Sequence, residues 1–157
     1  MDRHPLILTR QSTGLLIIDV QDKFKPVIPD IDDVVENITK LILAFQMYEM
    51  PVIVTEQYPK GLGNTIEIIE EQFKFIEIIE KLSFSCCGEP EFVKQMEKLS
   101  LKTVVVTGVE THVCVNQTVL DLLHAGYRVH VIADAVSSRH KTDYEIALRK
   151  MEKAGEW

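Results

Sequence analysis

The sequence has few cysteines, no excess of positive charge and no long hydrophobic run, and each shortage excludes a class of protein. Three of the 157 residues are cysteine, too few for a fold held together by disulfides. Lysine and arginine total 17 against 24 aspartate and glutamate, for a net charge of −7. We therefore expect neither nucleic acid nor a membrane as a main partner. No apolar run approaches the roughly 18 residues that span a bilayer.

The rest of the composition is typical of one globular domain. Hydrophobic residues make up 46% of the chain and charged residues 26%, near the averages for globular proteins. A chain of this length buries roughly 68–70% of its unfolded surface, so we expect a single domain over residues 1–157. The first five residues lack the charged-then-apolar pattern of a secretory signal, which predicts a cytoplasmic protein.

Apolar runs typical of buried strands alternate with helical patterns along the whole chain. The runs do not alternate with polar residues, as expected for strands buried on both faces. We predict strands at 13–20, 52–54, a segment ending near Lys81, 103–108 and 128–133. We predict helices at about 31–49 with Asp30 as N-cap, a short one within the ambiguous stretch 65–81, and others at about 90–99, 111–124 and 141–153, with a long loop at 57–63.

This alternation predicts an α/β fold with three layers, α/β/α, around a mostly parallel sheet, because right-handed crossovers return each strand to the same direction. Ligands of such sheets bind beyond the carboxyl ends of the strands. The residues at strand ends are therefore the first candidates for function.

Cys114 lies six residues after Gly108, in the first turn of the helix that follows the most β-branched strand. The helix dipole and the free N–H groups of a first turn favour a thiolate, so we expect an activated nucleophile with a lowered pKa. A small buried core residue is the commoner role for a cysteine. Its position at a strand-to-helix turn favours function.

Asp19 and Lys81 end two other predicted strands. A loop-capping aspartate and a surface lysine are the ordinary interpretations. Together with Cys114 they form a possible catalytic set, with the carboxylate as general base, the amine as charge support and the thiol as attacking group.

Other candidates are weaker. His112 is two residues from Cys114, and such side chains point apart on a helix, so it is expected to line or cap the site. Cys86 and Cys87 are adjacent and close only a strained disulfide, which favours packing or loop thiols. The remaining histidines show no metal-ligand spacing, so we assign no metal and no cofactor.

Four segments match the motifs of a known family, over nearly the whole chain and in the family's order. They are Leu15-Leu16-Ile17-Ile18-Asp19-Val20-Gln21-Asp22, Lys81 to Ser85, Val106-Thr107-Gly108-Val109-Glu110-Thr111-His112-Val113-Cys114-Val115, and Ala133-Asp134-Ala135 with Ser137-Ser138-Arg139. Through them the chain resembles the isochorismatase-like cysteine hydrolases. The string Thr-Glu-Gln-Tyr-Pro-Lys-Gly-Leu-Gly at 55–63 resembles the branch of isochorismatase-domain-containing proteins.

The resemblance implies a catalytic triad of Asp19, Lys81 and Cys114. It also implies a cis peptide bond between Val109 and Glu110, and an oxyanion hole built from the backbone N–H groups of Glu110 and Cys114. The implied chemistry is acyl transfer: Asp19 takes the thiol proton, Cys114 attacks a carbonyl, and water releases an acid from the thioester. The implied enzyme needs no metal.

Two departures from the motifs of known subfamilies narrow the range of expected substrates. The zinc nicotinamidases of the family carry an Asp-x-His motif where this chain has Thr55-Glu56-Gln57-Tyr58. True isochorismatases lack the nucleophilic cysteine that this chain has at position 114. Both activities are disfavoured, and a small amide or related carbonyl compound remains, with Gln57, Tyr58 and His112 expected to line its pocket.

Family members usually continue past the last helix with another strand and helix, whereas this chain ends at Trp157. Either the chain is truncated, or a partner subunit covers the incomplete edge of the sheet, because an exposed edge invites pairing. We expect a homo-oligomer, a dimer or larger.

Two rivals to the hydrolase stay open. One is a non-catalytic binding protein on the same fold, and the other is a thiol redox sensor centred on Cys114.

Overall fold

The structure, a computed structural model, describes residues 4–73 and 77–157. In these residues, five parallel strands form one sheet in the order β3-β2-β1-β4-β5. The strands are β1 (Thr13–Ile18), β2 (Val52–Gln57), β3 (Ile78–Lys81), β4 (Thr103–Val109) and β5 (Arg128–Ser137). The α-helices are α1 (Ile31–Met47), α2 (Pro59–Leu62), α3 (Glu67–Glu70), α4 (Pro90–Lys98), α5 (Asn116–His124) and α6 (Lys141–Ala154).

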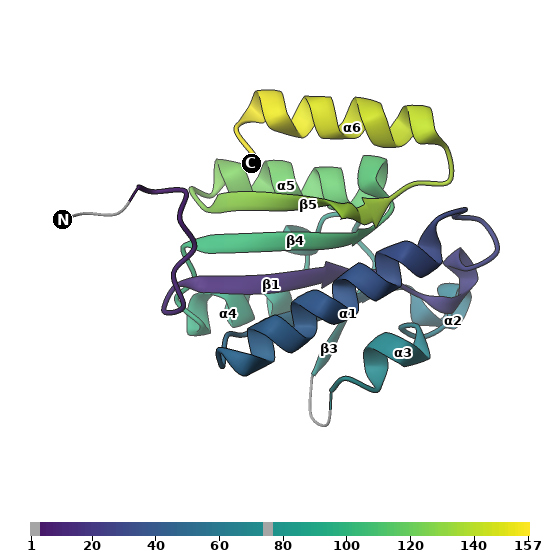
Figure 1. Cartoon of the computed structure of the whole chain (residues 1–157), viewed down its shortest axis with the longest axis horizontal. Helices are drawn as coiled ribbons and strands as arrows, with labels where there is room; N and C mark the ends of the chain where they lie inside the picture. Colours follow the sequence, from purple (N-terminus) through teal and green to yellow (C-terminus); the bar gives the residue numbers. More distant parts are fainter. Residues whose placement is uncertain (1–3, 74–76) are drawn as a thin grey trace.

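Helices cover both faces of the sheet (Figure 1). In β1, Leu15 and Ile17 belong to a core cluster with α1 and α3, whereas Leu16 and Ile18 belong to a second cluster with α4, α5 and α6. All four side chains are fully buried, which explains why the run is apolar at every position rather than at alternate ones. The prediction of a three-layer α/β/α fold with a parallel sheet is confirmed.

Several predicted boundaries differ from the structure. The strand predicted at 13–20 ends at Ile18, because Asp19 adopts a left-handed backbone conformation with φ 55°. The strand predicted at 52–54 continues through polar residues to Gln57, and the one at 128–133 continues to Ser137. The helix predicted to end near residue 49 ends at Met47. The hydropathy of the sequence does not predict that polar side chains at the ends of these strands are buried.

Three further predictions are corrected. The loop predicted at 57–63 contains the short helix α2. The helix predicted at 111–124 begins with a π-helical turn, η3 (Thr111–Val115), before α5. Asp30 precedes α1 as predicted but makes no capping bond with its side chain, because its carboxylate accepts a hydrogen bond from the Ser137 hydroxyl.

Trp157 lies alongside the outer edge of β5. Its N–H donates to the Val129 carbonyl at 3.0 Å, and the Val131 N–H donates to the Trp157 carbonyl at 2.8 Å. Among the described residues, no helix is both long and apolar enough to cross a membrane.

Gly108 allows β1 and β4 to approach closely just before the chain reaches the candidate site. It pairs with Ile18 in the parallel register and has φ +116°. A Cβ atom at this position would lie 2.1 Å from the Ile18 carbonyl oxygen, far inside any tolerated contact. Only glycine satisfies both the backbone conformation and this approach.

We expect Gly108→Ala to lower the free energy of unfolding by at least about 3 kcal/mol, because the new methyl group meets backbone that cannot move without separating the two central strands. Gly126→Ala is the matched control. Gly126 also has a positive φ, +88°, but nothing lies within 4 Å of a Cβ there, so only the backbone cost of about 1 kcal/mol is expected. Urea unfolding followed by circular dichroism measures both, and equal losses would show that the close approach does not matter.

Candidate active site

Three strand ends bring Asp19, Lys81 and Cys114 together. Asp19 follows β1, Lys81 ends β3, and Cys114 lies in η3 directly after β4. β1 and β4 are neighbours at the centre of the sheet, where the strand order reverses, which is the usual ligand position in such folds. The exposed fractions of Asp19, Lys81 and Cys114 are 0%, 2% and 6%, so these three residues are almost completely shielded from water.

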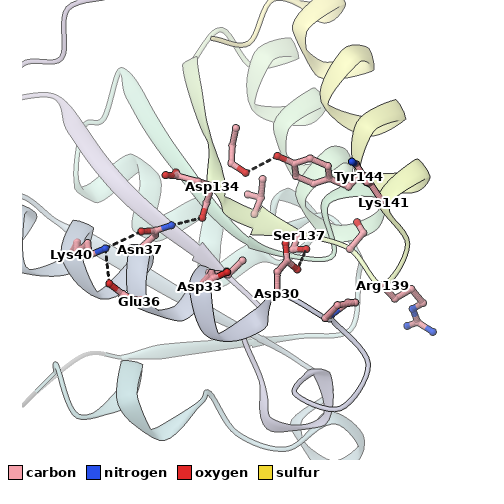
Figure 2. Close-up of a pocket in the computed structure, with 15 residues that line it drawn as sticks. Asp30, Asp33, Glu36, Asn37, Lys40, Asp134, Ser137, Arg139, Lys141 and Tyr144 are labelled. Atoms are coloured by element: carbon pink, nitrogen blue, oxygen red, sulfur yellow. Dashed lines mark hydrogen bonds and ion pairs between the residues drawn. The ribbon is translucent and has the colours of Figure 1, made fainter.

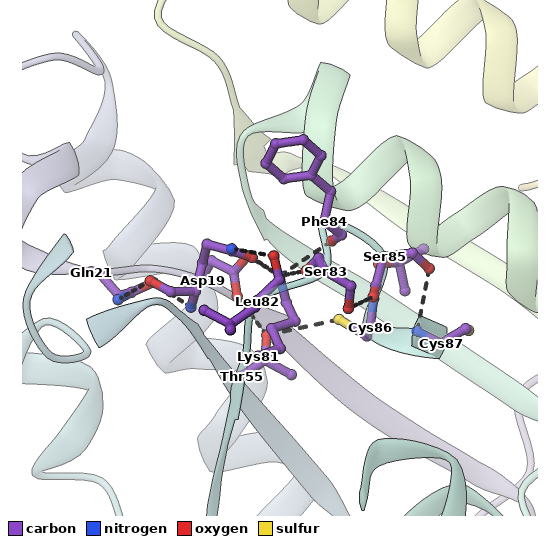
Figure 3. Close-up of polar contacts among 12 residues, drawn as sticks. Asp19, Gln21, Thr55, Lys81, Leu82, Ser83, Phe84, Ser85, Cys86 and Cys87 are labelled. Carbon is purple, nitrogen blue, oxygen red and sulfur yellow. Dashed lines mark hydrogen bonds and ion pairs between the residues drawn. The ribbon is translucent and has the colours of Figure 1, made fainter. Parts of the chain in front are cut away.

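Both carboxylate oxygens of Asp19 accept hydrogen bonds from side chains of the two strands beyond β1, β2 and β3 (Figure 3). The Lys81 ammonium donates to one of its carboxylate oxygens, Oδ2, at 2.6 Å. The Thr55 hydroxyl, from β2, donates to the other oxygen, Oδ1, at 2.7 Å. Both side chains of the ion pair are fully buried. A buried carboxylate needs such hydrogen-bonding and charged partners, because burying the charge without them costs several kcal/mol.

The Lys81 ammonium has four acceptors around it. Besides Asp19 these are Gln57 Oε1 at 2.8 Å and the backbone carbonyls of Ser83 and Phe84, each at 3.2 Å. An ammonium has three protons to donate, so all of them are used inside the protein. The arrangement suits a fixed positive charge rather than a proton donor to a substrate.

Burial is the largest influence on the ionisation of this pair. It raises the pKa of Asp19, although the Lys81 charge and the hydrogen bonds from Lys81 and Thr55 act in the opposite direction. Burial alone would lower the pKa of Lys81, but the Asp19 carboxylate, together with Cys86 and Cys114, more than compensates and the pKa is raised. A carboxylate with a raised pKa beside a permanent ammonium is well suited to accept a proton.

Cys114 is close enough to Asp19 for the Asp19 charge to act on the pKa of its thiol. Burial and the Asp19 charge raise the pKa of the thiol, and the Lys81 ammonium only partly offsets them. The expectation of a lowered pKa from the helix dipole was therefore wrong. The first turn is π-helical and buried, so desolvation outweighs the dipole. These surroundings favour a neutral thiol over a preformed thiolate.

Glu110 directly precedes the η3 turn that carries Cys114. The peptide bond between Val109 and Glu110 is cis. The buried Glu110 carboxylate forms a bidentate pair with the Arg139 guanidinium, including Arg139 Nη2 to Glu110 Oε1 at 2.8 Å, and it also accepts the Arg139 backbone N–H at 3.0 Å. Burial raises the pKa of Glu110, but Arg139 holds it below its usual value. This side chain anchors the turn.

The three predicted pocket residues occupy different surroundings. The amide of Gln57 is bonded to Lys81 and to the Leu82 carbonyl. Tyr58 is half exposed and lines a cavity of about 350 Å³ outside β3. His112 Nδ1 is hydrogen-bonded to the Ser138 hydroxyl at 2.9 Å. The structure brings Gln57 into contact with the triad and turns the imidazole of His112 toward Ser138.

Cys86 is also close to the triad. It is fully buried, its Sγ lies 3.8 Å from the Thr55 hydroxyl, and its N–H donates to Thr118 Oγ1 at 2.9 Å (Figure 3). Burial raises the pKa of Cys86 to about 12 and that of the half-buried Cys87 to about 11. Both are free thiols, as predicted from their adjacent positions.

A cavity of about 660 Å³ lies away from the triad, between α1 and the end of β5 (Figure 2). Its polar groups largely bond one another: Lys40 pairs with Glu36 at 2.8 Å, and Asn37 donates to the Asp134 carbonyl at 2.8 Å. In the part of the chain that the structure describes, no three histidine, cysteine, aspartate or glutamate side chains are grouped to hold a metal ion.

The sequence reasoning missed Thr55 and Arg139. Thr55 carries a usable signal, because it follows the apolar run of β2 at the same edge of the sheet as Asp19. Arg139 lies in a segment that carries the family resemblance, but 29 residues separate it from Glu110 and nothing in the sequence pairs the two.

A neutral Cys114 thiol should react with iodoacetamide only as rising pH deprotonates it. The pH dependence of alkylation is followed at the Cys114 peptide by mass spectrometry. We expect the wild-type midpoint to lie above the ordinary thiol pKa of about 8.5. Asp19→Asn removes a nearby negative charge and lowers the midpoint by about one pH unit or more, whereas Lys81→Met removes the positive charge and raises it. Alkylation of the fully buried Cys86 reports unfolding. A midpoint that moves in the same direction in both folded variants would contradict this arrangement.

We expect the contribution of the Glu110–Arg139 pair to the free energy of unfolding to depend on pH. Because the pKa of Glu110 is lowered in the folded state, the pair stabilises the fold above the ordinary pKa of 4.5, and this stabilisation is lost as the pH falls through the lowered pKa. We expect Arg139→Met to lower the free energy of unfolding by about 1–2 kcal/mol at pH 7 and by less at acidic pH. Arg149→Met, on the exposed face of α6, is the control. A loss that is independent of pH would indicate packing rather than charge.

Comparison with known proteins agrees with this arrangement of the fold. A sequence model of the family described as "Isochorismatase domain" matches residues 13–157. The chain is 41% identical over 153 residues to isochorismatase family protein 1A of Dictyostelium discoideum, covering 94% of this chain and 74% of that protein. It is 39% identical over 150 residues to isochorismatase domain-containing protein 2 of Xenopus laevis, covering 94% and 71%.

Among solved structures, the chain superposes on one described as MAR1 ribonuclease from Caenorhabditis elegans with a TM-score of 0.90 and 39% identity, covering 95% of this chain and 77% of that one. The matches extend from the first strand to the last residue and include every strand end described above. The chain therefore belongs to the isochorismatase-like hydrolase family, in the branch of the isochorismatase domain-containing proteins.

Proposed function

We propose that the protein is a metal-independent cysteine hydrolase that cleaves a small amide or related carbonyl compound. The observation that carries the proposal is the position of the buried Cys114 thiol and a buried carboxylate, Asp19, at the ends of neighbouring strands, with the Asp19 charge balanced by Lys81. A nucleophile, a base and a group that orients the base are the parts that covalent catalysis requires.

In the first step, Asp19 accepts the thiol proton as the Cys114 sulfur attacks the carbonyl carbon. The raised pKa of Asp19 favours this transfer, because a base is most effective when its pKa is near the working pH. The carbonyl oxygen takes up negative charge in the tetrahedral intermediate. We assign its stabilisation to the backbone N–H groups of Glu110 and Cys114, which lie at either end of the η3 turn.

In the second step, the intermediate collapses and the carbon–nitrogen bond breaks. The amine leaves with the proton that Asp19 received, and an acyl thioester remains on Cys114. Water, deprotonated by Asp19, then attacks the thioester, and the acid leaves as the thiol is restored. Lys81 keeps its protons throughout, since all of them are bound within the protein.

The name of the Caenorhabditis elegans relative raises ribonuclease activity as a second candidate. The net charge of −7 provides no general attraction for a phosphate backbone. The Lys81 ammonium, enclosed by four acceptors, is not available to bind a phosphate. RNA is therefore included below as a substrate to be tested, and the amide is preferred.

We expect a panel of small primary amides to yield an acyl adduct on Cys114, detected by intact-mass spectrometry after rapid acid quenching. Cys114→Ala abolishes the adduct, and Asp19→Asn slows its formation by at least about 100-fold, the usual contribution of a general base. EDTA leaves the rate unchanged. Cys87→Ala is the control thiol variant and retains the adduct.

Unchanged turnover in Asp19→Asn or Cys114→Ala would overturn the triad. Binding of an amide without turnover, indifferent to both substitutions, would support a binding protein. Reversible oxidation of Cys114 by peroxide without turnover of any amide would support a redox sensor. Cleavage of RNA that survives Cys114→Ala would support the second candidate function, a ribonuclease.

The homo-oligomer expected from the sequence stays a prediction. Sedimentation of the purified protein measures the oligomeric state.

A further inference from the structure

Gln57 ends β2 and lies directly beside Lys81 in the parallel register of β2 and β3. Its amide oxygen accepts a hydrogen bond from the Lys81 ammonium at 2.8 Å, and its amide nitrogen donates to the Leu82 carbonyl at 2.9 Å. An ammonium only donates and a carbonyl only accepts. The amide therefore has a single orientation, and both of its ends are in use.

The backbone of Gln57 is fixed as firmly as its side chain. Its N–H donates to Gln21 Oε1 at 2.8 Å, and its carbonyl accepts from Gln21 Nε2 at 3.1 Å. Gln21 is fully buried and also donates to the Gly63 carbonyl at 2.6 Å. A second glutamine thus holds the first, which is the kind of support that a precisely placed group requires.

The position of the Lys81 ammonium depends on its two nearest acceptors, Asp19 at 2.6 Å and Gln57 at 2.8 Å. One of these acceptors is charged and the other is neutral. A neutral acceptor holds the ammonium without competing with Asp19 for its charge. By also donating to Leu82, Gln57 fixes the 82–84 segment, whose carbonyls at Ser83 and Phe84 complete the ammonium's contacts.

We propose that Gln57 is a positioning residue that acts through Lys81. Its amide oxygen holds the ammonium beside Asp19 and the Cys114 thiol, and its amide nitrogen fixes the segment that closes over that ammonium. The inference concerns the site of the proposed function. Its test measures the titration of a thiol and needs no substrate, so it succeeds or fails separately from the hydrolase assignment.

The test compares Gln57→Met with wild type in the pH dependence of Cys114 alkylation. The charged and titratable groups that act on this thiol are Asp19, Lys81 and Cys86. Methionine has a similar length but no hydrogen bonds to offer. Without the amide, the ammonium is less well fixed near the thiol and lowers its pKa less, so we expect the alkylation midpoint to rise by about half a pH unit, a threefold loss of thiolate.

A double-mutant cycle separates positioning from a general structural effect. If Gln57 acts through Lys81, Gln57→Met has no further effect on the midpoint in a Lys81→Met background. If Gln57 supports the site in some other way, the shift is equal in both backgrounds and the proposal is wrong. An unchanged midpoint in the Gln57→Met variant alone overturns it as well.

Two variants complete the design. Gln11→Met replaces an exposed glutamine before β1 and is expected to leave the midpoint unchanged. Gln57→Glu serves where the double variant does not fold, a condition that Cys86 alkylation reveals. It retains an acceptor for Lys81 but adds a negative charge, so a rise of the Cys114 midpoint is expected and a fall or no change contradicts the proposal.

Discussion

The buried ion pair between Lys81 and Asp19 is the interaction on which the site depends. It joins β3 to β1, two strands that are not neighbours, and therefore passes across the end of β2. Removing two charges from water costs several kcal/mol for each ion even after the protein relaxes. The cost explains why the end of β2 is polar: Thr55 and Gln57 supply the hydrogen bonds that the pair has lost from water.

Much of the fold follows from the sequence, because the apolar runs and the helical spacings have different periods. The uninterrupted run of β1 predicts burial on both faces, and the structure places alternate residues against different helix layers. The conformation of Asp19 is not predictable in this way. Asp19 has a left-handed φ, and its N–H donates to the Thr55 carbonyl at 3.1 Å, a contact that exists only once the sheet has formed.

The candidate site, like the fold, is predictable from the sequence only in part. Position at a strand end is visible in the sequence, and it identified Asp19, Lys81 and Cys114. The electrostatics of Cys114 is not visible, because the helix dipole and desolvation act in opposite directions and only the folded environment decides between them. Contacts such as Glu110 with Arg139 join distant segments, and neither residue type nor spacing reveals them.

The way in which Lys81 is enclosed has a consequence for how the site can change over evolution. The 82–84 segment faces the ammonium with its backbone carbonyls, so its side chains are directed elsewhere, and those of Leu82 and Phe84 remain 75% and 54% exposed. Every residue type has a carbonyl. Substitutions at these two positions can therefore alter the exposed surface of the segment while leaving the contacts of the Lys81 ammonium intact.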